Sequence, residues 1–237
     1  MTYAIDLNAI DVAIGKNSIV ESESVKTFAK GASLAAARRL ACEFYPFCFE
    51  FPLFLAAAIS HLRDERARLL LVGNLYEEHG GLDAAKIHPE LFRRYMRELG
   101  LDPAAHQDGE SSVLGARTAK RVTDICRHGP AHRALAALYA IELLFGPLCE
   151  ELARGLSSLS LSDQAMNFFV VHSGADVVHA EQLRRALAGA IRNHADFLDA
   201  LDIASEVSGL FYDLFELIAR APRARTTTDD LALDRAS

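Results

Sequence analysis

Apolar residues recur at intervals of three and four along most of this 237-residue chain. Segment 33–45 shows the pattern clearly, because Leu34, Ala37, Leu40 and Phe44 fall on one face of a helix. The alternation of apolar and polar residues that is typical of strands is weak almost everywhere, and we find no Asn-Gly or Asp-Gly hairpin flanked by such alternation. The sequence therefore predicts an all-α protein.

Glycine, proline and capping residues divide the apolar pattern into about seven to nine helices. The expected helices are 33–45, 53–62, 64–79, 88–98, 111–127, 131–155, 163–190 and 194–220. Pro46 and Pro52 are expected to kink or divide the segment that contains the first two. We expect a single folded domain over residues 1–221 and a flexible C-terminal tail over 222–237.

Charge and cysteine usage narrow the class of protein. The net charge of −7 argues against a nucleic-acid-binding protein, which usually carries a basic surface. No uncharged stretch reaches 18 apolar residues, so we expect no membrane span. The four cysteines form no CxxC pair, and the N-terminal segment lacks the pattern of a signal peptide. These features favour a cytoplasmic protein.

The expected helix 163–190 carries His172, Asp176 and His179 at spacings of four and three. Such spacings place two imidazoles and a carboxylate on one helical face, among apolar neighbours. These groups suit divalent iron, manganese or zinc. A solvated stripe or ordinary core histidines would give the same pattern, so this triple alone leaves a metal site open.

Three further residues can complete such a site. Glu142 lies in a nearly uniform apolar helix, where a carboxylate is costly unless it is paired or binds a metal. Glu78 ends one helix and His88 begins the next, so the two converge only if the Gly80-Gly81 loop folds back. Glu77 is an alternative to Glu78.

Together these six residues supply three imidazoles and three carboxylates, which is enough to hold two metal ions. Nitrogen and oxygen ligands without thiolates favour iron or manganese with positions open to dioxygen or substrate. Ferritin-like di-iron bundles carry two Glu-x-x-His motifs, whereas this chain has a single Asp-x-x-His motif. A di-iron site here would therefore belong to a different bundle.

The order Asn-Leu-x-x-Glu…Gly…His over 74–88, then Glu142, then His-x3-Asp-x2-His over 172–179 resembles the heme-oxygenase-like diiron oxidases and oxygenases. The likeness extends over about 28–215. It implies a single-domain bundle of about seven core helices with two non-heme iron ions and dioxygen as cosubstrate, without heme. The ligands it implies are Glu78, His88, Glu142, His172, Asp176 and His179.

The resemblance also implies an oxidoreductase of specialised metabolism that acts on a small amino acid or amine. The expected outcomes are C–H activation, N-oxygenation, oxidative C–C cleavage or desaturation, or aza-ring formation. An external electron donor and a homodimer are compatible with it. One branch, a self-sacrificing p-aminobenzoate synthase, needs a tyrosine and a lysine where this chain has Val25 and Leu152, which speaks against that branch.

Four aromatic residues near these motifs are candidates for substrate contact, with simple packing as the alternative: Phe44, Tyr45, Phe49 and Tyr139. Five other histidines are expected at the surface: His61, His106, His128, His132 and His194.

Two other functions remain open. One is a cofactor-free hydrolase of the thiaminase II type, with a nucleophile among Cys42, Cys126 and Cys149. The other is a non-catalytic helical interaction module whose polar core is structural.

Overall fold

The computed structural model describes residues 6–106 and 113–220, and most of these residues are helical. The α-helices are α1 (Leu7–Gly15), α2 (Glu23–Ala29), α3 (Leu34–His61), α4 (Glu65–Glu78), α5 (His88–Glu98), α6 (Val113–His128), α7 (Ala131–Leu156), α8 (Asp163–Ala190) and α9 (His194–Ala219). Short 3-10 helices occur at η1 (Ile19–Glu21), η2 (Gly80–Leu82), η3 (Pro103–His106) and η4 (Ser157–Leu159). Within the described ranges the chain forms no strand, which confirms the all-α prediction. The tail predicted over 222–237 lies outside these ranges.

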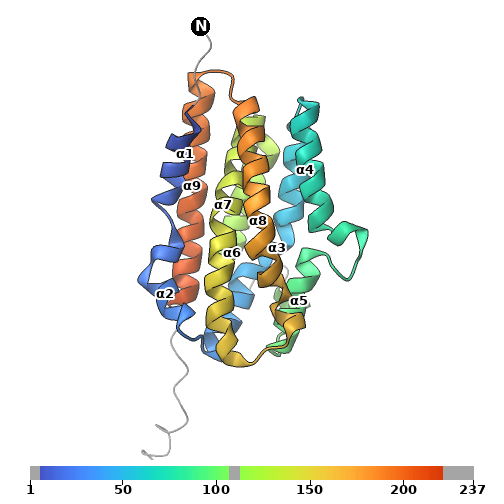
Figure 1. Ribbon diagram of the computed structural model, residues 1–237, viewed down its shortest axis with the longest axis vertical. Coiled ribbons are helices and arrows are strands. Elements are labelled where there is room, and N and C mark those ends of the chain that lie inside the picture. Colours follow the sequence, from blue (N-terminus) through green and yellow to red (C-terminus); the bar gives the residue numbers. More distant parts are fainter. Residues whose placement is uncertain (1–5, 107–112, 221–237) are drawn as a thin grey trace, which may run out of the picture.

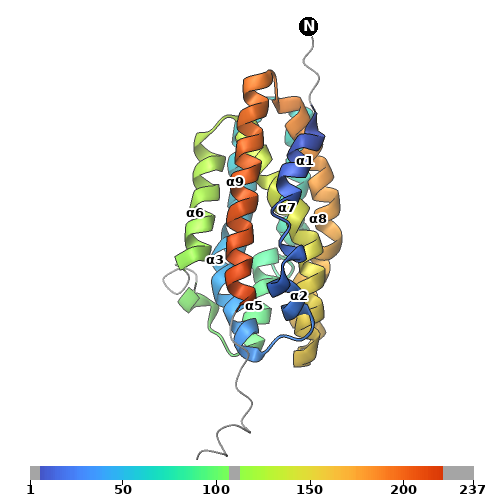
Figure 2. The ribbon, with the colours of Figure 1, turned by 90° about the vertical axis from the view of Figure 1, so that its left-hand side faces the viewer.

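Helix α7 is the centre of the bundle, since 18 of its 26 residues are buried. It packs most extensively against α8 and α9, and also contacts α2, α3 and α6. Figure 1 shows α7, α8 and α9 running side by side along the long axis, with α4 and α5 on the flank beyond α8. Figure 2 shows α6 beside α9 on another side of the bundle. Helices α4 and α5 both pack against α8, and α3 packs against both of them.

Helix α3 differs from the expectation, because Pro46 and Pro52 lie inside one continuous helix instead of dividing it. Each proline removes one backbone N–H from the helical ladder. The aromatic residues between and around them are held by packing, with Phe47 at 5.7 Å from Phe44 and 5.4 Å from Phe54 between ring centroids. Burial of these rings stabilises the helix through both interruptions.

Helix α3 is also long and apolar enough, by length and composition, to cross a membrane. Half of its most apolar window is buried within the bundle. It contacts α4, α5, α6, α7 and α9, as expected of a core helix in an all-α protein.

The segment before residue 33, for which the sequence pattern gave no helix, forms α1 and α2. Both helices are short, and side chains cap them: Asp6 accepts the N–H of Asn8, and Ser22 accepts the N–H of Val25. Helix α2 lies close against α7 at Gly155, where a Cβ would stand 2.4 Å from the carbonyl oxygen of Phe28. Glycine at this position therefore allows the N-terminal segment to cover the bundle.

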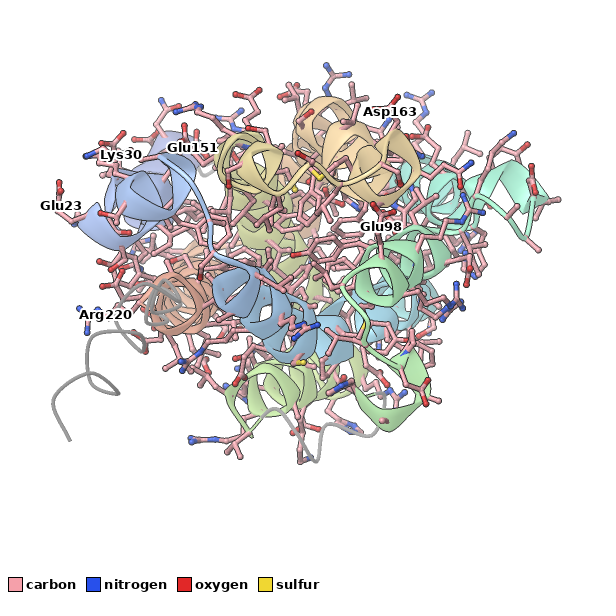
Figure 3. The ribbon with its side chains drawn as sticks, turned by 90° about the horizontal axis from the view of Figure 1, so that it is seen from below. Glu23, Lys30, Glu98, Glu151, Asp163 and Arg220 are labelled. Atoms are coloured by element: carbon pink, nitrogen blue, oxygen red, sulfur yellow. The ribbon has the colours of Figure 1, made fainter. Side chains whose placement is uncertain are left out.

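The lower end of the bundle joins α5 to the start of α8. Figure 3 shows Glu98 near the end of α5 beside Asp163 at the start of α8. The backbone N–H of Ser162 donates to Glu98 Oε1 at 2.6 Å, and the Ser162 hydroxyl donates to the second carboxylate oxygen. Ser162 itself caps α8. These contacts fix the start of the helix that carries His172.

Candidate metal centre

The turn after α4 brings Glu78 and His88 together. Gly80, Gly81 and Leu82 have φ values of 62°, 63° and 70°, in the left-handed region. A Cβ on Gly80 would stand 2.5 Å from the Lys86 carbonyl carbon, so the return of the loop requires glycine there. His88 Nδ1 lies 2.9 Å from Glu78 Oε2, and both side chains are buried. The loop therefore folds back as the convergence of these two residues requires.

Helix α8 supplies the opposite wall. His172, Asp176 and His179 all lie on its buried face, at 6%, 1% and 0% exposure. Helix α7 approaches this face closely at Gly146, where a Cβ would stand 3.2 Å from Asp176 Cβ. This approach brings Glu142 Oε1 within 3.4 Å of His179 Nδ1.

Two sets of three side chains can each surround an ion, since the ligand atoms of each set lie within 4.8 Å of one another. The first set is Glu78, His88 and His172, and the second is Glu78, Glu142 and His179. Glu78 belongs to both sets. Asp176 lies beside them, on the wall of the same cavity as Glu78 and Glu142. The structure thus gathers all six residues that the sequence singled out.

Several buried polar atoms in this cluster have no hydrogen-bond partner. They include Glu78 Oε1, both carboxylate oxygens of Asp176, and His179 Nδ1. Buried polar atoms in proteins are almost always paired, and leaving one unpaired costs free energy. Oxygen and imidazole nitrogen atoms with open lone pairs are what a divalent metal ion binds. The residues therefore fit a metal ion better than they fit a purely structural network.

The charges of the cluster lead to the same conclusion. Burial, together with the carboxylates of Glu142 and Glu78, raises the pKa of Asp176 well above its usual value. Burial likewise raises the pKa of Glu142, although His179 opposes it. Burial also lowers the pKa of His172 to about 4, with His88 acting in the same direction. Three carboxylates in one enclosed space repel each other, and a divalent cation removes this repulsion.

The structure separates the roles of Glu77 and Glu78. The side chain of Glu78 is 2% exposed and lies inside the cluster, whereas that of Glu77 is 56% exposed. Glu77 Oε2 lies 2.9 Å from His179 Nε2, on the far side of the ring from Glu142. A carboxylate in this position accepts the outer N–H of the imidazole and leaves Nδ1 free to bind a metal.

A small cavity of about 20 Å³ adjoins the cluster. Its walls include the aromatic rings of Phe44, Phe47, Phe51, Phe145 and Phe168. Of the aromatic residues that the sequence singled out, Phe44 lines this cavity. Tyr139 lies on the other side of Glu142, where its hydroxyl donates to Asp11 Oδ1 at 2.7 Å.

The remaining aromatic candidates lie elsewhere. Tyr45 stacks on Phe92 at 6.1 Å between ring centroids, and its hydroxyl accepts a hydrogen bond from Arg93. Phe49 packs beside Tyr45 at 6.2 Å. Neither residue lines the cavity.

Further residues surround the cluster; the sequence analysis included Asn74 only as part of the Asn-Leu-x-x-Glu motif and did not single out Phe145 or Phe168. Asn74 is buried and donates from Nδ2 to Glu142 Oε1 at 3.3 Å. Phe145 and Phe168 place their ring centroids 5.4 Å and 4.1 Å from that of His172. Their helical spacing was available as a signal, because they lie three and four residues from proposed ligands. His132, expected at the surface, is instead 4% exposed.

The cysteines offer little support for a thiol nucleophile. Burial raises the pKa of Cys126 to about 12 and that of Cys149 well above the usual range. Burial and the neighbouring Glu43 also raise the pKa of Cys42. Thiols with raised pKa values are protonated at neutral pH and are poor nucleophiles.

Comparison with known proteins agrees with both the metal-binding cluster and the all-helical fold. A family model described as "iron-containing redox enzyme" matches residues 38–207. A 4-aminobenzoate synthase of Chlamydia trachomatis is 26% identical over 216 residues, which cover 89% of this chain and 90% of that protein. A 4-chloro-allylglycine synthase of Streptantibioticus cattleyicolor is 25% identical over 155 residues, 64% of this chain and 58% of that protein. A solved domain from Shewanella denitrificans with a heme oxygenase-like fold superposes with a TM-score of 0.74 at 18% identity, covering 99% of this chain and 97% of that one.

Proposed function

We propose that this chain, which belongs to the family of iron-containing redox enzymes, is a non-heme di-iron oxidoreductase that uses dioxygen. It is an enzyme with the heme oxygenase-like fold. Its proposed substrate is a small amino acid or amine. The proposed ligands are the six buried residues of the cluster: Glu78, His88, Glu142, His172, Asp176 and His179.

One observation carries the proposal for two ions. Two sets of three ligands, each compact enough for one ion, share the carboxylate of Glu78. A carboxylate has two oxygens and can serve two neighbouring metals. The imidazoles are divided between the sets, with His88 and His172 in one and His179 in the other. Such a division is expected of a two-metal site.

When bound, the iron ions would supply the electrons that activate dioxygen for attack on a substrate N–H or C–H group. The protein residues would position this chemistry and shield it. The rings of Phe44, Phe145 and Phe168 line the cavity beside the ligands and leave little room there for water. Asn74 donates to Glu142 and fixes the orientation of that carboxylate. Glu77 orients His179 in the same way.

The relatives support an amino-acid-related substrate. Their names describe the formation of 4-aminobenzoate and of 4-chloro-allylglycine, both small molecules that carry amino and carboxylate groups. This chain has Val25 and Leu152 where its resemblance to the family implies the tyrosine and lysine of the self-sacrificing branch, and both residues are buried apolar side chains. We therefore propose an external substrate for this chain.

Iron stoichiometry tests the proposal. The protein is loaded with excess Fe(II) without oxygen, loose metal is removed, and the bound iron is counted and examined by Mössbauer spectroscopy. We expect two high-spin Fe(II) ions per chain and a reduced count in His179→Ala. His128→Ala, at the exposed C-terminal end of α6 and outside both ligand sets, is the matched control and should keep both ions. Absence of specifically bound iron in the wild-type protein would refute the proposal.

A further inference from the structure

A second hollow lies on the outer side of Glu142, between α7 and α8. This outer groove has a volume of about 260 Å³. Its walls come from Leu143 and Pro147 of α7 and from Val177 and Ala180 of α8, and Tyr139 and Arg184 lie at one end. Glu142 lines both the outer groove and the inner aromatic cavity. A molecule in the groove is therefore in contact with a proposed metal ligand.

The sizes of the two spaces decide which one can hold a substrate in this conformation. The inner cavity, at about 20 Å³, has room for about one water molecule. An α-amino acid has at least five non-hydrogen atoms and does not fit there. The outer groove is more than ten times larger. A small molecule can thus reach the edge of the ligand cluster from outside without displacing the aromatic walls.

The charged groups of the groove are placed to receive a zwitterion. Glu181 and Arg184 have opposite charges and lie three residues apart on α8, on the groove side of the helix. Arg184 is held in place by Asp11 of α1, whose Oδ2 accepts hydrogen bonds from Nε at 3.3 Å and from Nη2 at 3.1 Å. Nη2 also donates to Asn8. These bonds involve Nε and Nη2, and the guanidinium also interacts with the hydroxyl of Tyr139 at the same end of the groove. A guanidinium has five N–H donors, so a carboxylate in the groove can bind the donor that these partners leave.

We propose that the outer groove is the substrate-binding site and that it takes an α-amino acid. The carboxylate binds Arg184, the ammonium group faces Glu181, and the side chain lies over Leu143, Pro147 and Val177 toward Glu142. This inference rests on the proposed function for the chemistry that follows binding. The groove itself exists without metal, so binding can be tested separately.

Binding is measured by isothermal titration calorimetry with three amino acids and the amines that lack only their carboxylate. The pairs are L-norleucine with pentylamine, L-lysine with 1,5-diaminopentane, and L-phenylalanine with phenethylamine. Titrations use the metal-free and the anaerobic iron-loaded protein. We expect at least one amino acid to bind about tenfold or more tightly than its amine, because a guanidinium–carboxylate pair is a charge-assisted hydrogen bond.

Matched variants locate the site. Arg184→Gln should remove the advantage of the amino acid over the amine, and Arg184→Lys should restore only part of it. Arg185→Gln changes the next residue, which pairs with Glu181 at 2.7 Å and does not line the groove, and should keep most of that advantage. Val177→Trp should block binding, whereas Val178→Trp, also at an exposed position but outside the groove, should not.

The outcomes separate this inference from the proposed function. If iron binds fully but no amino acid binds better than its amine, the groove proposal fails and the di-iron proposal stands. The groove proposal would also be overturned if Arg184→Gln and Arg185→Gln lowered the preference for the amino acid over the amine equally. If amino acids bind through Arg184 but iron does not bind, the di-iron proposal fails and the groove remains an amino-acid site. Circular dichroism verifies that each variant is folded.

Discussion

Two buried histidines of this bundle differ in the number of acidic side chains around them. His132, at the start of α7, is 4% exposed, and its Nε2 lies 2.8 Å from Asp199 Oδ2, whose side chain is 40% exposed. His179, in the middle of α8, is fully buried beside three carboxylates, two of which also lie within its own metal-binding set. We call the first arrangement the His132 pair and the second the metal centre.

The comparison shows that burial of a histidine does not identify a metal site. The His132 pair has one acid for one imidazole, and water reaches the acid. The metal centre gathers three buried carboxylates in one enclosed space, and those of Glu78 and Asp176 keep oxygens without a hydrogen bond. Buried carboxylate oxygens without a hydrogen-bond partner distinguish a binding site from a structural pair.

The largest expected effect is the loss of iron when Glu78 is changed. Because Glu78 belongs to both ligand sets, Glu78→Gln should remove most of the iron from both positions. His132→Gln removes an equally buried histidine and should leave the iron content unchanged. Metal analysis after anaerobic loading measures both variants. Equal iron loss in the two would erase the distinction between the metal centre and the His132 pair.

The next effect concerns the carboxylate behind His179. Glu77→Ala removes the acceptor for His179 Nε2 and should weaken iron binding by about 10- to 100-fold, because outer partners orient metal-ligating histidines. Glu77→Gln keeps an acceptor oxygen and should recover part of that loss. Competition with a chelator measures the affinity. If Glu77→Ala instead loses all iron while Glu78→Gln keeps it, Glu77 is the ligand.

A smaller effect concerns the stability of the metal-free protein. Here a change in the His132 pair should matter more than a change in the metal centre. Asp199→Ala leaves the buried His132 without its partner and should lower the free energy of unfolding by about 1 kcal/mol. Asp176→Asn replaces a carboxyl whose pKa burial raises well above its usual value with a neutral amide of the same shape, so it should destabilise the protein less than Asp199→Ala does. Urea unfolding measures both. A larger loss in Asp176→Asn would mean that Asp176 is structural.

The comparison also shows what the sequence can predict. Helical spacing was enough to place His172, Asp176 and His179 on one face, because this geometry is local. The approach of Glu78 to His88 depends on three consecutive left-handed residues after α4, one of which is the non-glycine Leu82. From the sequence we could say that the loop after Glu78 must fold back to His88, but we could not show that it does.

Long-range contacts were the main limit of prediction. The pairing of Asp11 with Tyr139 and Arg184 joins residues 128 and 173 positions apart. Helix α1 has only nine residues, so its pattern was too short to indicate which face it covers. His132 was expected at the surface because its partner, Asp199, is 67 positions away. Such contacts depend on the assembled bundle.

The last and smallest effect is a pH dependence of the metal-free protein. Burial lowers the pKa of His179, but Glu142 and Glu77 outweigh it and raise the pKa from 6.5 to about 9. The folded state therefore binds this proton more tightly than the unfolded state, so the stabilisation is complete below pH 6.5 and is lost as pH rises to about 9. The raised pKa of Asp176 acts in the same direction, whereas the lowered pKa of His172 affects stability below pH 6.5.

The thermal midpoint of the metal-free protein should thus fall between pH 7 and pH 9, within the window set by the pKa of His179. His179→Gln should flatten this fall, and His132→Gln should retain it. Iron should also flatten it, because a metal-bound imidazole is already deprotonated and no longer exchanges this proton. A midpoint that is constant over this range in the metal-free wild type would mean that His179 is neutral in the folded protein. The carboxylates of Glu142 and Glu77 would then not be enough to keep a proton on His179.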